Sequence, residues 1–325
     1  MPLDDFLQRE IDVGSFSSAS YAIGSSAGIL RENALGHAVA VPFRIPATVD
    51  TLYDCASITK VLITTPLVLQ LLPLDEQVVR LLTHTSGLRA WMPLYAYPDP
   101  LRALREDGPE YEPGTRVVYS DLNFILLWSM LDDYVGLAQS RIFLPLGLTD
   151  AMFRPPCSLL PRIAATEWGQ RFEPRLAGRW DIPGLRQGLM WGDTNDGNSH
   201  HLGHGTAGNA GLFATARAVF RIAQAFVRGE LVSRELVTLA TRNHTIGLNE
   251  SRGLGWQLAS PSNAATSMLS AGSFGHMGFT GTSVWIDPAR DRIMVLLTNR
   301  VHPCAASIGM ARVRGELHRL ALAAD

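Results

Sequence analysis

Apolar residues recur along the chain at two spacings, and these separate predicted helices from predicted strands. Residues 1–13 are apolar at every third or fourth position, which is typical of a short amphipathic helix. Four short apolar runs bounded by glycine, proline or polar residues predict β-strands: 20–24, 37–41, 282–286 and 293–298. The predicted strands therefore lie at the two ends of the chain.

Longer stretches with helical spacing occupy mainly the middle of the chain and its last segment. They predict helices over these ranges: 57–72, 78–88, 124–131, 210–229 and 305–323. Pro66 lies inside the first of them and is expected to kink it or to remove one hydrogen bond. Two stretches rich in proline, glycine or aromatic residues, 91–114 and 180–208, are predicted to be loops.

This arrangement predicts an α+β fold. An antiparallel sheet would be assembled from both chain ends, with flanking helices and an inserted helical lobe. We expect one domain over 1–325 with two lobes. The α/β lobe would span about 1–55 and 212–325, and the helical lobe about 56–211.

Composition narrows the partners of the protein. The 325 residues include 28 basic and 30 acidic side chains, for a net charge of −2, and no basic run that would favour nucleic acid. No apolar run reaches the ~18 residues that a membrane span needs. The acidic N-terminus lacks the layout of a signal peptide, which predicts a cytoplasmic protein as written, or a periplasmic or secreted one if a leader was removed.

The candidate chemistry begins with Ser57 and Lys60. On a helix, residues three apart share one face, so the two side chains can meet. A serine hydroxyl becomes a good nucleophile when a nearby base takes its proton, and a desolvated lysine can serve as that base. Because serine and lysine are common, this pair alone also fits a helix cap with a solvated lysine.

Segments further along the chain strengthen the catalytic interpretation, because five of them resemble a known family in sequence order. They are 53–60 (YDCASITK), 81–88 (LLTHTSGL), 119–121 (YSD), 209–215 (NAGLFAT) and 276–282 (HMGFTGT). Together they resemble serine hydrolases of the β-lactamase and penicillin-binding-protein superfamily. The branch that they resemble most contains class C β-lactamases, D-alanyl-D-alanine carboxypeptidases and related carboxylesterases. The resemblance implies that the α+β fold is β-lactamase/transpeptidase-like.

The resemblance implies a role for each matching residue. Ser57 would be the acylated nucleophile, with Lys60 and Tyr119 sharing the proton shuttle. The backbone N–H groups of Ser57 and Phe279 would form the oxyanion hole, and His276 would line the pocket from an edge strand. Physical chemistry agrees on one point: Tyr119 can act as a base only beside a cation, which Lys60 would provide.

Three positions near the substrate complete the predicted site. Gly278 is expected to leave the edge strand bare where substrate backbone approaches. Asp121 stands where the family usually has asparagine, and a carboxylate there cannot donate a hydrogen bond to a substrate amide, although it could orient Lys60. His276 stands where lysine is commoner and, at neutral pH, offers at best one hydrogen bond. The connectors after Leu72 and over 135–141 are also short for the family.

A histidine-rich loop invites a different interpretation. It carries His200, His201 and His204 together with Asp193 and Asp196, but their spacing matches no common metal site. We therefore expect no metal and no cofactor, and interpret the loop as a polar wall beside the pocket.

The sequence thus predicts a serine hydrolase that cleaves a small ester or peptide substrate through an acyl-enzyme on Ser57. A β-lactamase-related carboxylesterase is favoured because His276 carries no permanent charge. The alternatives are a D-alanyl-D-alanine carboxypeptidase or penicillin-binding protein, and a weak β-lactamase. Outside enzymes, the alternative is a penicillin-binding sensor or a degenerate scaffold.

Overall fold

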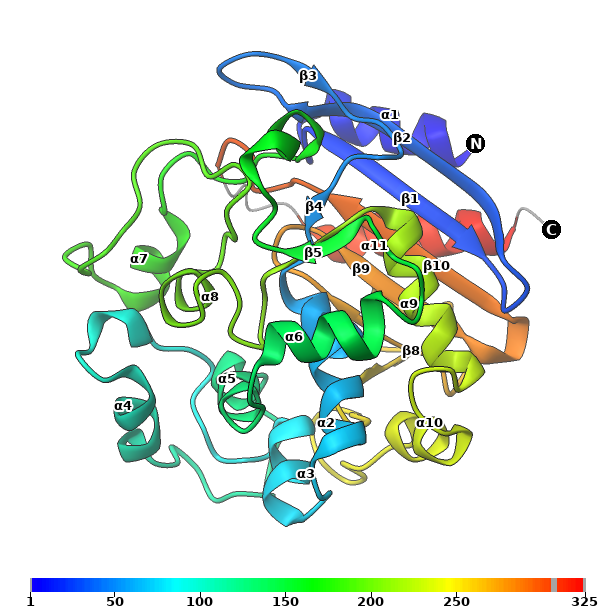
Figure 1. Ribbon diagram of the computed structural model, residues 1–325. Helices are drawn as coiled ribbons and strands as arrows, with labels where there is room; N and C mark the ends of the chain where they lie inside the picture. The colour runs from blue at the N-terminus through cyan, green and yellow to red at the C-terminus, as the bar shows by residue number, and fades with distance from the viewer. Residues whose placement is uncertain (1, 305–308, 324–325) are drawn as a thin grey trace.

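The computed structural model describes residues 2–304 and 309–323. Its centre is a seven-stranded antiparallel sheet in the order β3-β2-β1-β10-β9-β8-β7 (Figure 1). The strands are β1 (Ser18–Gly24), β2 (Ile29–Val39), β3 (Ile45–Pro46), β7 (Gln257–Leu258), β8 (Phe274–Met277), β9 (Ser283–Asp287) and β10 (Arg292–Thr298). The pairing of β1 with β10 joins the two ends of the chain, for example at Ala22 and Val295. This confirms the predicted α+β architecture.

Helices pack on both faces of this sheet because successive side chains of a strand point to opposite sides. Tyr21 and Leu296 face the first and last helices, α1 (Leu3–Asp12) and α11 (Met310–Leu322). These helices lie together behind the sheet in Figure 1. Ala22 and Val295 face the opposite side, where α9 (Ala216–Arg228) packs.

A second sheet of three short strands links distant parts of the chain. It has the order β4-β6-β5, with β4 at Tyr53–Asp54, β5 at Ala151–Phe153 and β6 at Leu212–Ala214. The helix predicted over 210–229 is therefore wrong at its start, since β6 comes first. Pairing with two remote strands outweighs local helical preference there. The helix begins only after Thr215, whose side chain accepts a hydrogen bond from the Ala218 N–H.

The remaining α-helices lie mostly between these sheet elements. They are α2 (Thr65–Leu71), α3 (Glu76–Leu82), α4 (Pro100–Asp107), α5 (Asp121–Ser129), α6 (Tyr134–Ala138), α7 (Phe172–Ala177), α8 (Gly197–Leu202) and α10 (Arg234–Thr241). The two predicted loops thus contain short helices, α4 and α8, which begin at the capping side chains of Asp99 and Asp196. Across the described ranges, none of the helices combines the length and apolar character needed to cross a membrane.

The helix predicted from residue 57 has an unusual opening. Residues 56–58 form a 3₁₀ turn, Lys60–Thr64 is π-helical, and regular α-helix follows as α2. Pro66 falls in the first turn of α2, where its missing N–H is tolerated.

Other boundaries also differ from the sequence prediction. The helix predicted over 78–88 ends at Leu82 as α3, because His84 has a left-handed backbone conformation with a φ of 57°. Strand β2 begins at Ile29, well before the predicted 37, and ends at Val39. At the C-terminus, the predicted helix start at 305–308 lies outside the described residues. The division into two lobes stays a prediction.

Candidate active site

Ser57 lies at the floor of a cavity, on a tight turn. Every other residue from 51 to 69 is buried, whereas Ser57 is partly exposed and lines the cavity. The preceding residue, Ala56, has a φ of 47°, a left-handed conformation that is uncommon for residues other than glycine. The Asp54 carboxylate holds this turn by accepting the Ala56 N–H at 2.8 Å. The turn therefore presents Ser57 on a fixed backbone.

Lys60 is fully buried beneath Ser57 and makes three hydrogen bonds. Its Nζ donates to Ser57 Oγ at 3.1 Å, to Asp121 Oδ1 at 2.7 Å and to the Asn209 carbonyl at 2.8 Å. These acceptors match the three hydrogens of an ammonium group. Burial works against the charge, yet Asp121 and then Tyr119 raise the pKa of Lys60 above its usual value. Lys60 is therefore a cation, and it donates to Ser57.

Tyr119 completes this group, just before α5. The Lys60 Nζ lies 5.2 Å from the centroid of the Tyr119 ring, and the phenol donates to Asp121 Oδ1 at 3.4 Å. Burial raises the pKa of Tyr119 above its usual value, against the effect of the Lys60 charge, and Asp121 adds to the increase. The structure thus brings Ser57, Lys60, Tyr119 and Asp121 together as the sequence predicted.

His276 lies on β8, across the cavity from these residues. Its Nδ1 is 2.9 Å from the Met277 carbonyl, which fits a neutral ring with the proton on Nδ1. Burial, followed by the nearby charges of Arg252 and Lys60, holds the pKa of His276 well below its usual value. The segment 276–282 thus presents an uncharged side chain to the cavity.

The strand that carries His276 is not the last strand of the sheet. The two-residue β7 pairs with β8, but only at Phe274 and Gly275. The prediction of an edge strand is therefore wrong for the strand as a whole, because β7 was too short to be detected in the sequence. At His276 the registered pairing is with Val284 of β9.

Gly278 is required by contacts inside the protein. A Cβ atom there would lie 2.0 Å from the Thr282 Oγ1 and 2.9 Å from the Cys55 carbonyl. The bare backbone lets β8 approach the turn that carries Ser57. The next residue, Phe279, lines the cavity and packs on Phe172, with 4.3 Å between ring centroids. A contact of Gly278 with substrate and the oxyanion role of Phe279 stay predictions.

The cavity has a volume of about 420 Å³ and two kinds of wall. The apolar wall consists of Trp91, Phe172, Leu176, Met277 and Phe279. The polar wall adds residues that the sequence analysis did not single out as site residues: Glu167, Glu173, Asn195, Glu250, Arg252 and Gln257, with Asp196 of the histidine-rich loop. Glutamates and arginines are common throughout the chain, and no motif surrounds these.

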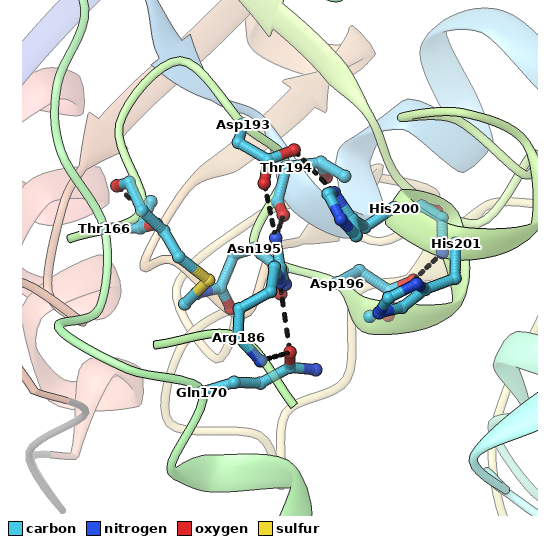
Figure 2. Close-up of polar contacts among 12 residues, drawn as sticks. Thr166, Gln170, Arg186, Asp193, Thr194, Asn195, Asp196, His200 and His201 are labelled. Carbon is cyan, nitrogen blue, oxygen red and sulfur yellow. Dashed lines mark hydrogen bonds and ion pairs between the residues drawn. The ribbon is translucent and has the colours of Figure 1, made fainter. Parts of the chain in front are cut away.

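Part of the polar wall is held by a loop cluster, which we define as Gln170, Glu173, Arg186, Asp193 and His200. Figure 2 labels its members other than Glu173. Arg186 donates to Gln170 Oε1 at 3.0 Å, to Asp193 Oδ2 at 3.0 Å and to the Asn195 carbonyl at 2.6 Å. Glu173 accepts the Gly197 N–H at 2.7 Å, and burial raises its pKa to about 7. The cluster ties residues 193–197 to α7.

The histidines of this loop contact protein groups. His200 Nδ1 lies 2.7 Å from Asp193 Oδ1 (Figure 2). His201 Nε2 lies 3.0 Å from the Gly184 carbonyl. Among the residues that the structure describes, no three histidine, cysteine or acidic side chains are grouped as metal ligands would be. Asp196 caps α8 through the Ser199 N–H at 2.7 Å and also lines the cavity.

Comparison with known proteins identifies the family of the chain. The family model described as Beta-lactamase matches residues 77–318. A protein of Salmonella typhi, named provisionally as a D-alanyl-D-alanine carboxypeptidase, is 26% identical, and the match covers 94% of this chain and 83% of that protein.

Solved structures show the same fold. A penicillin-binding protein homologue from Caulobacter crescentus superposes with a TM-score of 0.72 at 18% identity, over 98% of this chain and 96% of the other. The hydrolase EstCE1, described as having promiscuous acyltransferase activity, superposes with a TM-score of 0.68 at 18% identity, over 96% of this chain and 97% of the other. The chain is a serine hydrolase that belongs to the β-lactamase family.

Proposed function

We propose that the protein is a carboxylesterase that works through an acyl-enzyme on Ser57. The observation that carries this proposal is the ion pair between Lys60 and Asp121, 2.7 Å long, directly beside Ser57. This ion pair bears on which group accepts the proton of Ser57. It also bears on which substrates can form a hydrogen bond with the side chain at position 121.

Tyr119 is the proton acceptor in this mechanism. Lys60 already donates to Ser57, so it cannot take the proton of Ser57 while it remains an ammonium group. The raised pKa of Tyr119 makes its phenolate the minor form, which arises when the phenol loses its proton to solvent. In that form, the proton of Ser57 passes to the phenolate as Ser57 Oγ forms its bond to the ester carbonyl carbon. The same proton then goes to the departing alcohol as the ester C–O bond breaks. Water, activated by Tyr119 in turn, hydrolyses the acyl-enzyme.

Asp121 favours esters over acylamino substrates. β-Lactams and peptides present an amide carbonyl next to the reacting centre, and an asparagine at position 121 could donate a hydrogen bond to it. The Asp121 carboxylate has only hydrogen-bond acceptors, and it already accepts a hydrogen bond from Lys60 Nζ. A simple ester has no such amide, so it loses nothing at this position.

The apolar wall supports the same substrate class. Trp91, Phe172, Leu176, Met277 and Phe279 form a surface against which a short acyl chain can pack. His276 is neutral and therefore cannot provide the charge-assisted hydrogen bond that a substrate carboxylate gains from a lysine. The apolar wall and the neutral His276 thus favour an uncharged acyl group.

The decisive comparison uses three substrates: p-nitrophenyl butyrate, nitrocefin and a peptide ending in D-Ala-D-Ala. We expect kcat/KM at pH 7.5 to be highest for the ester. Asp121→Asn should narrow the gap to the two amide substrates, and His276→Lys should improve those that carry a carboxylate several-fold. A wild-type enzyme that already prefers nitrocefin or the peptide would contradict the ester assignment.

D-alanyl-D-alanine carboxypeptidase is the second candidate, since the Salmonella relative carries that provisional name. Faster release of D-alanine from the peptide than of p-nitrophenol from the ester would support it. Labelling of Ser57 without turnover of any of the three substrates would instead support a penicillin-binding sensor.

A further inference from the structure

Arg252 is a buried cation that lines the same cavity and has no part in the mechanism above. Arg252 lies shortly before β7 in the chain and forms an isolated β-bridge with Gln257 of that strand. Its exposed fraction is 4%. Its Cζ lies 5.6 Å from the centroid of the Tyr119 ring. Lys60 Nζ lies 5.2 Å from the same centroid, so two cations approach one phenol.

The hydrogen bonds of Arg252 are incomplete. Its Nη2 binds Glu250 Oε1 at 2.8 Å, whereas Nε and Nη1 are buried and have no hydrogen-bond partner among the described residues. Glu250 Oε1 also accepts the Gln257 Nε2 at 3.0 Å, so its charge is shared between two donors. A buried guanidinium with unsatisfied N–H groups is costly unless it interacts with a nearby negative charge.

The other cation is compensated more directly. Asp121 is 2.7 Å from Lys60 and 3.4 Å from the Tyr119 oxygen, so its carboxylate cancels the Lys60 charge and also opposes a phenolate. In relatives with asparagine at this position, lysine would keep its full effect on the tyrosine. In this chain, a phenolate at Tyr119 needs positive charge from elsewhere.

The remaining titratable neighbours of Tyr119 provide none. His84 lies 4.8 Å and His276 5.7 Å from it, between ring centroids. Burial, followed by the charge of Arg252, keeps the pKa of both histidines well below the usual value, so both are neutral. Of the groups named here, Arg252 is the cation that Asp121 does not offset.

We propose that Arg252 is a positioning residue that stabilises the phenolate of Tyr119 and so replaces the positive charge that Asp121 removes from Lys60. This rests on the proposed role of Tyr119 as the proton acceptor. No bond to Arg252 forms or breaks. Its charge favours the deprotonated phenol before Ser57 attacks, and it favours the same phenolate again before water attacks the acyl-enzyme.

The test is the pH dependence of kcat/KM for p-nitrophenyl butyrate, whose acid limb reports the proton acceptor of the free enzyme. Arg252→Gln should move that limb to higher pH and lower kcat/KM at pH 7.5 by roughly 10- to 100-fold. Arg252→Lys should recover part of the loss, because it keeps a charge. Arg221→Gln is the matched control: Arg221 is also paired with a glutamate and has an unpartnered Nη1, but it lies on α9. It should leave the profile unchanged.

A second variant acts in the opposite direction. Glu250→Gln removes the carboxylate that compensates Arg252 and should move the acid limb to lower pH. Arg252→Gln should also cost less in an Asp121→Asn background, where Lys60 regains its effect. A limb that stays in place in both Arg252→Gln and Glu250→Gln would overturn the inference. If Arg252→Gln does not fold, Glu250→Gln alone decides.

Failure of the inference is distinguishable from failure of the proposed function. Ser57→Ala must abolish ester turnover if the acyl-enzyme mechanism holds. Turnover lost in Ser57→Ala, together with an unmoved acid limb in the Arg252 and Glu250 variants, would reject the role of Arg252 alone. Turnover that survives in Ser57→Ala would reject the mechanism, and the role of Arg252 with it.

Discussion

Two dense polar groups adjoin the cavity, and they differ in where their donors point. Ser57 and its neighbours line the cavity directly, whereas the loop cluster reaches it through Glu173. Around Ser57, Lys60 forms an ion pair with Asp121 and still directs one N–H at Ser57 Oγ. In the loop cluster, Arg186 forms an equally clear ion pair with Asp193, but its other donors go to Gln170 and to backbone carbonyls. The donors of Arg186 in the loop cluster all bind other protein groups. In the group at Ser57, one donor of Lys60 binds a hydroxyl oxygen that faces the cavity. The direction of the hydrogen-bond donors, more than the density of charge, distinguishes the group that we propose to be catalytic.

The largest expected effect is the complete loss of covalent labelling when Ser57 is replaced. Ser57→Ala should abolish covalent labelling by a fluorophosphonate probe and by a fluorescent penicillin, while Tm changes little, because a partly exposed hydroxyl stabilises the fold only slightly. Arg186→Met serves as the control from the other wall and should still be labelled. Undiminished labelling of the Ser57 variant would reject Ser57 as the nucleophile.

Next in size is the coupling within the catalytic group. Lys60→Ala and Tyr119→Phe should each lower kcat/KM by about 10²- to 10⁴-fold, because each removes part of one proton-transfer unit. The kcat/KM of the double variant should be only slightly lower than that of the less active single variant. Losses that multiply fully would show that the two residues act separately.

A smaller and different effect is expected from the loop cluster. Arg186→Met leaves Asp193 without its arginine and should lower the free energy of unfolding by roughly 2–4 kcal/mol. Since the cluster holds one cavity wall, KM should rise several-fold while kcat stays within about threefold of wild type. Denaturant unfolding and steady-state kinetics measure the two quantities. A kcat loss as large as that of Lys60→Ala would remove the distinction between the walls.

The smallest effect concerns Glu173, whose pKa burial raises to about 7. In the unfolded chain a glutamate titrates near pH 4.3, so between these values the folded protein binds more protons. Stability therefore falls as pH rises through this window. We expect Glu173→Gln to make the free energy of unfolding less dependent on pH between 5 and 8, by about 1–3 kcal/mol. An unchanged pH dependence would place the ionisation of Glu173 outside this window.

The catalytic group was predictable because its spacing is local and its motifs are ordered. Ser57 and Lys60 share a turn of helix, and Tyr119 comes just before a clear apolar helix. The short helices α4 and α8 were missed, although the capping residues Asp99 and Asp196 were a usable signal. Strand β6 and Arg252 carried no such signal. Pairing with remote strands defines β6, and a bridge to Gln257 places Arg252 beside Tyr119. Long-range contacts of this kind leave little trace in the local pattern.

Asp54 connects the turn that carries Ser57 with the loop around Asn195. Its carboxylate accepts the Ala56 N–H at 2.8 Å on one side and the Asn195 N–H at 2.6 Å on the other. The turn that carries Ser57 and the loop that forms the polar wall therefore shift together. Loop redesign for a bulkier substrate would displace Ser57 if it changed the length of the chain near Asn195. Because Glu173 of α7 accepts the Gly197 N–H, insertions in α7 would reach Ser57 by the same route.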